Sequence, residues 1–257
     1  MLIKKIDSTT STNSFASELA NEIDGDFAVM AREQTAGRGQ RGNSWESAPG
    51  KNVTLSILLR PNGGIIPTEQ FVLSQCASIG VVETVRHYIG DEFGKVAIKW
   101  PNDIYVGERK ICGILIENSI SNGMIRRTIM GIGLNVNQQR FESDAPNPVS
   151  MFQLTGTEVN VDEVARLMCE KIEKNCEKYL KPEMYDELRE RYFSMLWRHP
   201  GFYPYIEASS GEQFEGEIIK IAPSGHITLM DTNGVSRCYA FKEVKATGLS
   251  PCPKQAL

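Results

Sequence analysis

The stretch Gln34-Thr35-Ala36-Gly37-Arg38-Gly39-Gln40-Arg41-Gly42-Asn43-Ser44-Trp45 joins two β-favouring segments, and the rest of the chain is organised around it. Glycine permits positive φ and lets a ligand approach the backbone closely. Backbone N–H groups in such a loop can surround an anion, and arginine adds a planar set of donors for phosphate or carboxylate. The same letters also fit a solvated surface loop, because short glycine motifs often occur by chance. The neighbouring segments have to decide between the two interpretations.

Apolar strands are predicted on both sides of this glycine-rich loop, over residues 27–31 and 52–59. The loop lacks the G-x-x-x-x-G-K-[ST] pattern and no helix follows it directly, which excludes a P-loop. G-R-G-Q-R-G also does not open a βαβ unit, which excludes the dinucleotide fingerprint of the Rossmann fold. Any phosphate ligand would therefore be bound by a different arrangement.

The 257-residue chain has the composition of an ordinary globular protein, with 41% hydrophobic and 23% charged residues. Its net charge of −4 gives no overall basic surface for nucleic acid. The six cysteines form no C-x-x-C pair and no zinc-type spacing, so we expect no metal site and buried free thiols in a reducing cytoplasm. The sequence shows no signal peptide and no membrane-spanning run, so we expect a cytoplasmic protein without a membrane partner.

Hydrophobic periodicity predicts an α+β chain. We expect helices over residues 15–23, 71–89, 161–180 and 183–196, and strands over residues 2–6, 95–117 (three strands with two turns) and 125–137. Beyond residue 201 short strands alternate with Ser-Gly, Pro-Ser-Gly and Thr-Asn-Gly turns, which is typical of a small β-barrel. We interpret residues 198–201 as a linker between domains over residues 1–200 and 201–257.

Several polar residues have both a structural and a functional interpretation. The Ser11-Thr12-Asn13 run could cap the first helix or bind a polar ligand, and composition favours the cap. Asn102 and Asp103 follow a proline and could simply form a turn. Lys110 begins an apolar strand, where a lysine could extend its head to solvent.

The predicted strand over residues 125–137 has two unusual features. Gly131 and Gly133 weaken a strand unless another group approaches its backbone closely. Asn135 and Asn137 alternate with apolar residues, so both amides face one side, toward either solvent or a ligand.

Five motifs occur together in an order that resembles the biotin protein ligase family, and the resemblance spans almost the whole chain. They are Ser11-Thr12-Asn13, Q-x-x-G-R-G from Gln34, K-W-P-N-D at Lys99–Asp103, R-K-x-x-G-I-L-x-E at Arg109–Glu117, and G-I-G-x-N-V-N at Gly131–Asn137. The resemblance implies a mixed-sheet catalytic domain with flanking helices, like that of class II synthetases. It also implies that the C-terminal barrel is SH3-like.

The activity implied by the resemblance is a two-step ligation. Biotin and ATP, with Mg²⁺, form biotinyl-5′-AMP and pyrophosphate, and the biotin then passes to a lysine of a biotin carboxyl carrier domain. The repressor-type members of the family carry an N-terminal winged helix, and no helix-turn-helix pattern precedes Ser11, so we expect no DNA binding. The chain could act as a monomer or a homodimer.

The resemblance also implies a role for individual residues. Biotin-binding residues are implied at Ser11, Thr12, Asn13, Gln34, Gly37, Arg38, Gly39, Gln40, Lys110 and Gly113. ATP-binding residues are implied at Arg38, Arg41, Trp45, Lys99, Asn102 and Asn135, with Trp45 stacking on adenine. Catalytic roles are implied for Lys110, Arg38 and Asp103, with Asp103 orienting or deprotonating the acceptor lysine.

The chain departs from the fullest family pattern, G-R-G-R-x-G-R, at Gln40 and Asn43. Glutamine keeps hydrogen-bond donors but loses the charge, so we expect the adenylate to be held less tightly. Two rival functions remain at the level of sequence. One is lipoate–protein ligase, which shares the fold and the adenylation step, although K-W-P-N-D and the G-R-G loop favour biotin. The other is a non-catalytic nucleic-acid or protein-binding module.

Overall fold

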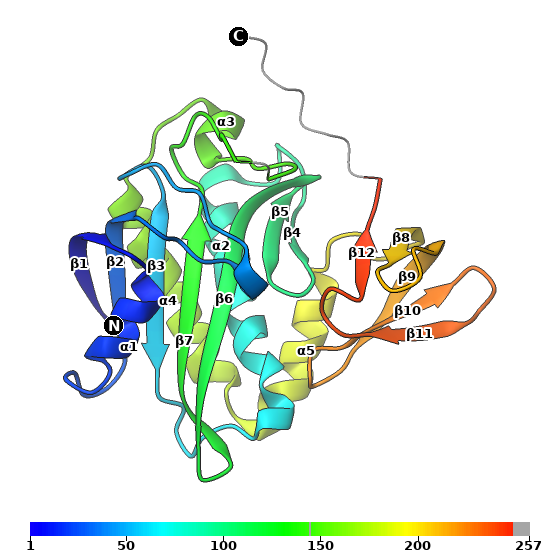
Figure 1. The fold of residues 1–257 in the computed structure, drawn as a ribbon, viewed down its shortest axis with the longest axis horizontal. Helices are drawn as coiled ribbons and strands as arrows, with labels where there is room; N and C mark the ends of the chain where they lie inside the picture. The colour runs from blue at the N-terminus through cyan, green and yellow to red at the C-terminus, as the bar shows by residue number, and fades with distance from the viewer. Residues whose placement is uncertain (144, 249–257) are drawn as a thin grey trace.

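The computed structural model describes residues 1–143 and 145–248, apart from the side chain of Arg41. Figure 1 shows a large sheet with helices on both faces and a smaller sheet at the C-terminal end. The large sheet has seven strands in the order β1-β2-β3-β7-β6-β5-β4. The strands are β1 (Leu2–Thr9), β2 (Phe27–Gln34), β3 (Val53–Leu59), β4 (Val96–Lys99), β5 (Asp103–Val106), β6 (Arg109–Ser121) and β7 (Met124–Leu134). Only the β1–β2 pair is parallel in this sheet as described, so the sheet is mixed, as predicted.

Burial on both faces explains the apolar central strands. Every residue of β3 is buried, because helices lie against one face and α1 (Thr12–Leu19) lies against the other. Alternate residues of β2 separate the two cores, with Phe27 and Val29 beside α1 and Ala28 and Met30 on the opposite face.

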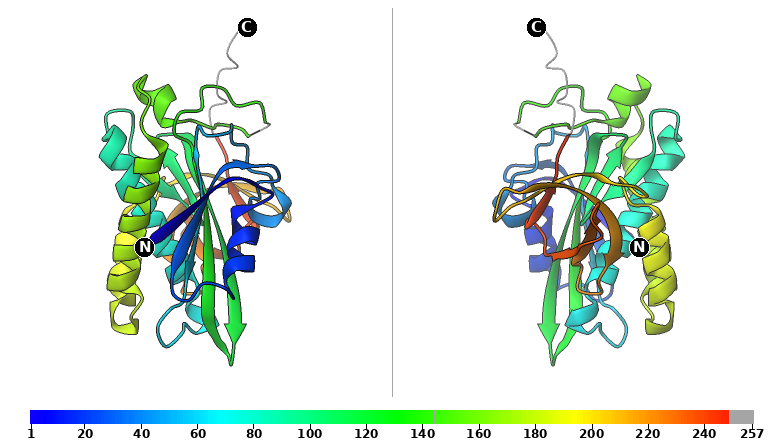
Figure 2. Two further views of the ribbon diagram at one scale, coloured as in Figure 1. Left: turned by 90° about the vertical axis from the view of Figure 1, so that its left-hand side faces the viewer. Right: turned by 90° about the vertical axis from the view of Figure 1, so that its right-hand side faces the viewer.

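Three long helices cover the face opposite α1 (Figure 2). They are α2 (Phe71–Ile89), α4 (Val161–Tyr179) and α5 (Tyr185–Ser194). The shorter helical elements are α3 (Met151–Thr155), η1 (Gln40–Gly42), η2 (Pro67–Glu69) and η3 (Pro182–Met184). Gly80 lets α2 and α4 pack closely, because a Cβ there would lie 2.6 Å from Cγ1 of Ile172. Asn160 caps α4, with its side chain accepting from the backbone N–H groups of Asp162 and Glu163.

The first helix is shorter than predicted. α1 ends at Leu19, whereas the apolar spacing extended the prediction to Ile23. Arg60 explains the early end, because its Nη2 donates to the carbonyls of Ala20 and Ile23 at 2.7 and 2.9 Å. The guanidinium of Arg60 thus supplies hydrogen bonds to carbonyls beyond Leu19, so that no further turn of helix is needed to pair them.

The C-terminal residues form a five-stranded antiparallel sheet in the order β11-β10-β9-β8-β12. Its strands are β8 (Tyr203–Glu207), β9 (Gln213–Ile221), β10 (Ile227–Asp231), β11 (Ser236–Tyr239) and β12 (Val244–Ala246). Four of them were predicted and β12 was not, because three residues are too short to show a pattern. The strand pairing among the described residues is that of an open sheet rather than a closed barrel, with a single bridge from Phe241 to Val244.

Hydrogen bonds in and around residues 198–201, the segment that we interpreted as a linker, join the C-terminal sheet to the large sheet. Trp197 Nε1 donates to the carbonyl of Gly107 at 2.9 Å, and Arg198 Nη1 donates to the carbonyl of Thr247 at 2.7 Å. Trp100 Nε1 donates to the carbonyl of Gly225 at 2.8 Å. Leu229 and Tyr239 belong to the same apolar core as α2 and α4. The C-terminal sheet therefore has a fixed place beside the large sheet.

The five cysteines in the described part are free thiols. Cys76, Cys112, Cys169 and Cys176 are buried as expected, but Cys238 is exposed because it faces outward on the edge strand β11. Cys252 lies outside the described residues. No described helix has the length and apolar character needed to span a bilayer.

Candidate active site

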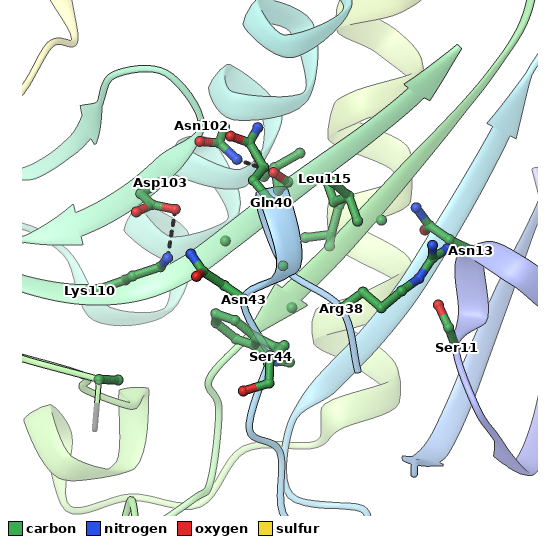
Figure 3. A pocket seen from close by; sticks show the side chains of 18 of the residues that line it. Ser11, Asn13, Arg38, Gln40, Asn43, Ser44, Asn102, Asp103, Lys110 and Leu115 are labelled. Atoms are coloured by element: carbon green, nitrogen blue, oxygen red, sulfur yellow. Dashed lines mark hydrogen bonds and ion pairs between the residues drawn. The ribbon is translucent and has the colours of Figure 1, made fainter. Parts of the chain in front are cut away.

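A cleft of about 730 Å³ lies between the glycine-rich loop and the α1-side face of the large sheet. Figure 3 shows the arrangement: Ser11, Asn13 and Arg38 gather at one end, and Asn102, Asp103 and Lys110 lie at the other. β6 and β7 form its floor between the two ends, where Gly113 pairs with Gly133 and Leu115 with Gly131. The loop crosses above this floor and contributes Gly39, Gln40, Gly42, Asn43, Ser44 and Trp45 to the lining.

The glycine-rich loop is a small hairpin rather than an irregular surface segment. Trp45 N donates to the carbonyl of Gly37 at 2.9 Å, and Gly39 N donates to the carbonyl of Asn43 at 2.6 Å. Gly37 does not line the cleft, because the backbone of Trp45 covers it: a Cβ at residue 37 would lie 2.7 Å from the Trp45 carbonyl oxygen. The hairpin places Gln40 in the cleft, where its Oε1 is buried without a partner among the described residues.

A buried polar network forms the first end of the cleft. Gln34 Oε1 accepts from Thr12 N at 2.8 Å and from Thr12 Oγ1 at 3.0 Å. Ser56 Oγ lies 2.7 Å from Thr12 Oγ1 and 2.6 Å from Asn13 Oδ1. Asn13 Nδ2 donates to Glu117 Oε2 at 2.7 Å. The capping interpretation that composition favoured is wrong: Ser11 occupies the N-cap position of α1 but makes no side-chain capping bond, and all three predicted residues are buried in the cleft wall.

Arg38 enters this end from the loop. Its Nη2 lies 3.2 Å from Glu117 Oε1 and 3.3 Å from Ser14 Oγ. Glu117 therefore holds Asn13 and Arg38 together on one carboxylate. The motif over Arg109–Glu117 contains Glu117, but no role was predicted for this residue. Ser56 was not predicted at all, because it lies in an apolar strand and no local pattern indicates its contact with α1.

Lys110 and Asp103 form an ion pair of 2.7 Å at the second end of the cleft. The register between β5 and β6 shifts between Ile104 and Tyr105, which pairs Lys110 with Tyr105 and turns its side chain toward Asp103. Lys110 Nζ also lies 5.7 Å from the ring of Trp45. Asn102 lines the cleft beside this pair and donates its amide N–H to the carbonyl of Ile114.

Trp45 lies directly on the cleft floor. A Cβ at residue 133 would lie 2.3 Å from Trp45 Cε2, so Gly133 leaves the space that the indole occupies. Trp45 Nε1 is buried and has no hydrogen-bond partner within the described part of the chain. The indole is therefore a flat apolar surface with one free donor, next to Lys110.

Two implied ATP-binding residues, Lys99 and Asn135, stand apart from this site. Lys99 lies outside the cleft lining: its Nζ hydrogen-bonds the Tyr105 hydroxyl at 2.9 Å and lies 5.3 Å from the Trp197 ring, and burial lowers its pKa. Asn135 is buried behind the floor, with Nδ2 donating to the carbonyl of Val149 at 3.0 Å. The side chain of Arg41 lies outside the described part of the structure.

Asn137, the second asparagine after β7, is likewise buried. Its side chain exchanges hydrogen bonds with the backbone of Val159, at 2.7 and 3.0 Å. Burial rules out the solvated edge for both amides, and the ligand contact of Asn135 stays a prediction. Both side chains hold the segments that follow the strand.

The chain matches the model of the biotin/lipoate A/B protein ligase family over residues 3–135, which is half of its length. The chain belongs to this family. A biotin–[acetyl-CoA-carboxylase] ligase of Paracoccus denitrificans is 37% identical over 164 residues, covering 62% of this chain and 67% of the relative. The bifunctional ligase/repressor BirA of Bacillus subtilis is 40% identical over 134 residues, covering 52% of this chain but 40% of the relative.

Solved structures of biotin protein ligases share the fold of this family member. The Aquifex aeolicus enzyme in complex with biotin and ATP superimposes with a TM-score of 0.77 at 22% identity, covering 96% of this chain and 99% of that one. The Leishmania major enzyme in complex with biotinyl-5-AMP gives a TM-score of 0.65 at 21% identity, covering 93% and 98%. Both comparisons cover the C-terminal sheet as well as the large sheet.

Proposed function

We propose that this family member is an ATP-dependent biotin protein ligase, which forms biotinyl-5′-AMP and transfers biotin to a lysine of a biotin carboxyl carrier domain. One observation carries the proposal: a single cleft connects a buried polar cluster at Thr12 and Asn13 to the Lys110–Asp103 pair. The ligases to which the chain is most similar in the comparisons above act on biotin by their names, which agrees with this arrangement.

The polar cluster suits the ureido head of biotin. A ureido group offers two N–H donors and one carbonyl acceptor, and the hydroxyls and amides of Ser11, Thr12 and Gln34 can match both kinds of group. The part of biotin between the ureido head and the carboxylate is apolar, and it would lie over the floor formed by β6 and β7. Its carboxylate would then point toward Lys110.

Adenylation needs two negatively charged groups to meet, the biotin carboxylate and the α-phosphate of ATP. A carboxylate oxygen attacks phosphorus, the new C–O–P bond forms, and pyrophosphate leaves. Lys110 can neutralise the oxygens of both reactants, and the amides of the glycine-rich loop can add to that effect. Arg38 would first have to leave Glu117, with which it pairs at the polar end of the cleft. The flat surface of Trp45 is suited to stack on adenine.

Mg²⁺ would enter this site mainly with the nucleotide. The described residues hold no group of three His, Cys, Asp or Glu side chains that could bind a metal by themselves. Magnesium commonly takes one or two carboxylates plus phosphates and water, and Asp103 could supply one such carboxylate. The ion would add charge neutralisation at the phosphates.

Transfer requires a neutral amine at the acceptor lysine. The amine nitrogen attacks the carbonyl carbon of the anhydride, a C–N bond forms, the C–O bond breaks, and AMP leaves. Asp103 lies at the Lys110 end of the cleft, where it can accept the ammonium proton or orient the amine. Its pairing with Lys110 at 2.7 Å would have to loosen when the adenylate occupies the site.

Transfer to an isolated carboxyl carrier domain tests the proposal. The purified protein, ATP, Mg²⁺ and biotin should increase the mass of the carrier domain by one biotinyl group. A carrier domain whose acceptor lysine is replaced by arginine is the matched control and should stay unmodified. Modification by lipoate instead of biotin would assign the site to the lipoate branch of the family. No modification by either acid would favour a binding module.

A further inference from the structure

A second segment forms the cleft wall at the Lys110 end, and a carboxylate outside the cleft holds it. Ser143, Ala145 and Pro146 also line the cleft. Glu46, the residue after Trp45, accepts hydrogen bonds from the backbone N–H groups of this segment. Glu46 Oε1 lies 2.9 Å from Glu142 N, and Glu46 Oε2 lies 2.8 Å from Ser143 N.

Gln138 completes the attachment at the start of the same segment. Its Nε2 donates to Glu46 Oε1 at 2.9 Å and to the carbonyl of Arg140 at 2.9 Å. Its Oε1 accepts from Ala48 N at 2.9 Å and from Asn52 Nδ2 at 2.6 Å. Segment 138–143 is thus fixed to the residues that directly follow the glycine-rich loop.

The far end of the wall is fixed to the backbone of Lys110. Lys110 N donates to the carbonyl of Asn147 at 2.8 Å, and Val149 N donates to the carbonyl of Lys110 at 2.9 Å. The described parts of the wall are therefore attached through Glu46 and Gln138 on one side and through the backbone of Lys110 on the other. Without Glu46, the backbone N–H groups of Glu142 and Ser143 would lose a charged acceptor, and Gln138 would be left to hold the start of the segment.

We propose that Glu46 is a positioning residue for the nucleotide half of the cleft, acting through the backbone of Glu142 and Ser143. This inference rests on the proposed function for the identity of the ligand. Glu46 itself is not among the residues that line the cleft, so its effect on ATP is indirect. The biotin half, built around Thr12 and Asn13, has no described hydrogen bond to Glu46 or to segment 138–143.

Glu46→Gln separates the two halves of the cleft in an experiment. The variant keeps the size of the side chain but loses the charge. We expect binding of a non-hydrolysable ATP analogue to weaken about tenfold, the difference between a charged and a neutral acceptor, while biotin affinity changes less than about twofold. Glu142→Gln is the matched control, because its exposed carboxylate lies on the same segment and only its backbone contacts Glu46.

Amide hydrogen exchange gives a readout that does not depend on activity or on a ligand. We expect faster exchange at the Glu142 and Ser143 amides in Glu46→Gln than in the wild type, and no change in β7. If that variant does not fold, Glu46→Asp retains the charge on a shorter side chain and should show the same two effects more weakly.

Three results would overturn the proposal: equal loss of biotin and ATP affinity, unchanged ATP affinity, or unchanged exchange at both amides. Failure of the wild type to bind biotin would instead overturn the proposed function. In that case the exchange measurement would still decide whether Glu46 positions the segment.

Discussion

Two glycines of β7 mark the places where side chains from elsewhere in the chain cross the large sheet. A Cβ at residue 131 would lie 2.3 Å from Asn13 Oδ1, and a Cβ at residue 133 would lie 2.3 Å from Trp45 Cε2. Each glycine therefore makes room for one wall of the cleft, Asn13 at the polar end and Trp45 near Lys110. Any larger residue at either position would displace a side chain that faces the ligand.

In the proposed function, Lys110 is the side chain on which the adenylation step depends most. Lys110→Ala should slow single-turnover formation of biotinyl-AMP by about 10²–10³-fold, as when one charge-stabilising donor is lost. The fold should survive, because its partly exposed ion pair with Asp103 is worth about 0–1 kcal/mol. Lys245→Ala, on the exposed side of β12, is the control and should behave as the wild type. Near-normal adenylate formation in Lys110→Ala would remove Lys110 from the mechanism.

We predict that Gln40 affects how tightly the adenylate is held. Gln40 lines the cleft, and its buried Oε1 has no hydrogen-bond partner among the described residues. The family that the sequence resembles often has arginine at this position. A charged donor exceeds a neutral one by roughly 1.4 kcal/mol, or about tenfold in affinity. Gln40→Arg should therefore release biotinyl-AMP about tenfold more slowly than the wild type, measured as a dissociation rate. Equal rates would mean that another cation already binds the phosphate.

At the scale of elements, the site consists of loops attached to a rigid sheet. Sequence periodicity predicted α2 with the bounds that the structure has, but it extended the first helix too far and missed the short helix α3. The turn after β6 has positive φ at Asn122 and Gly123, as that dipeptide favours. The contacts between loops could not be predicted. Glu46 and Glu142 are 96 residues apart, and neither differs in sequence from an ordinary surface acid.

The attachment of segment 138–143 should depend on pH through Glu46. Burial would raise the pKa of Glu46, but hydrogen bonds from Ser143, Glu142 and Gln138 outweigh it and hold the pKa below the ordinary 4.5. A carboxyl with a depressed pKa stabilises the folded state above its unfolded pKa and loses that contribution as pH falls through the folded value. The free energy of unfolding of the wild type should therefore exceed that of Glu46→Gln at neutral pH. That difference should shrink steadily below pH 4.5. A difference independent of pH would show that the charge contributes nothing.

At the scale of the whole molecule, the C-terminal sheet reaches the cleft. Phe241 lies in the lining, and its ring makes an edge contact with Trp100 at a centroid distance of 6.1 Å. Sequence reasoning predicted a separate small barrel and gave it no residue of the site. Its composition indicates strands, but nothing local indicates that the turn before β12 would lie beside the K-W-P-N-D motif.

Removing the Phe241 ring tests this contribution without truncating the chain. Phe241→Ala should slow biotin transfer to the carrier domain about two- to tenfold, which corresponds to one lost aromatic contact, and should leave biotin affinity unchanged. Phe202→Ala is the control, because that ring is 42% exposed. If both variants transfer biotin at the wild-type rate, the C-terminal sheet acts on the site in some other way than through Phe241.

The central claim is that one cleft joins a biotin carboxylate to the α-phosphate of ATP. Exchange of labelled pyrophosphate into ATP measures that step most directly, because it requires reversible formation of the acyl-adenylate and no acceptor protein. We predict exchange that depends on biotin, is absent with lipoate, and falls by the same factor as adenylate formation in Lys110→Ala. Exchange supported by lipoate but not by biotin, or no exchange with either acid, would contradict the account.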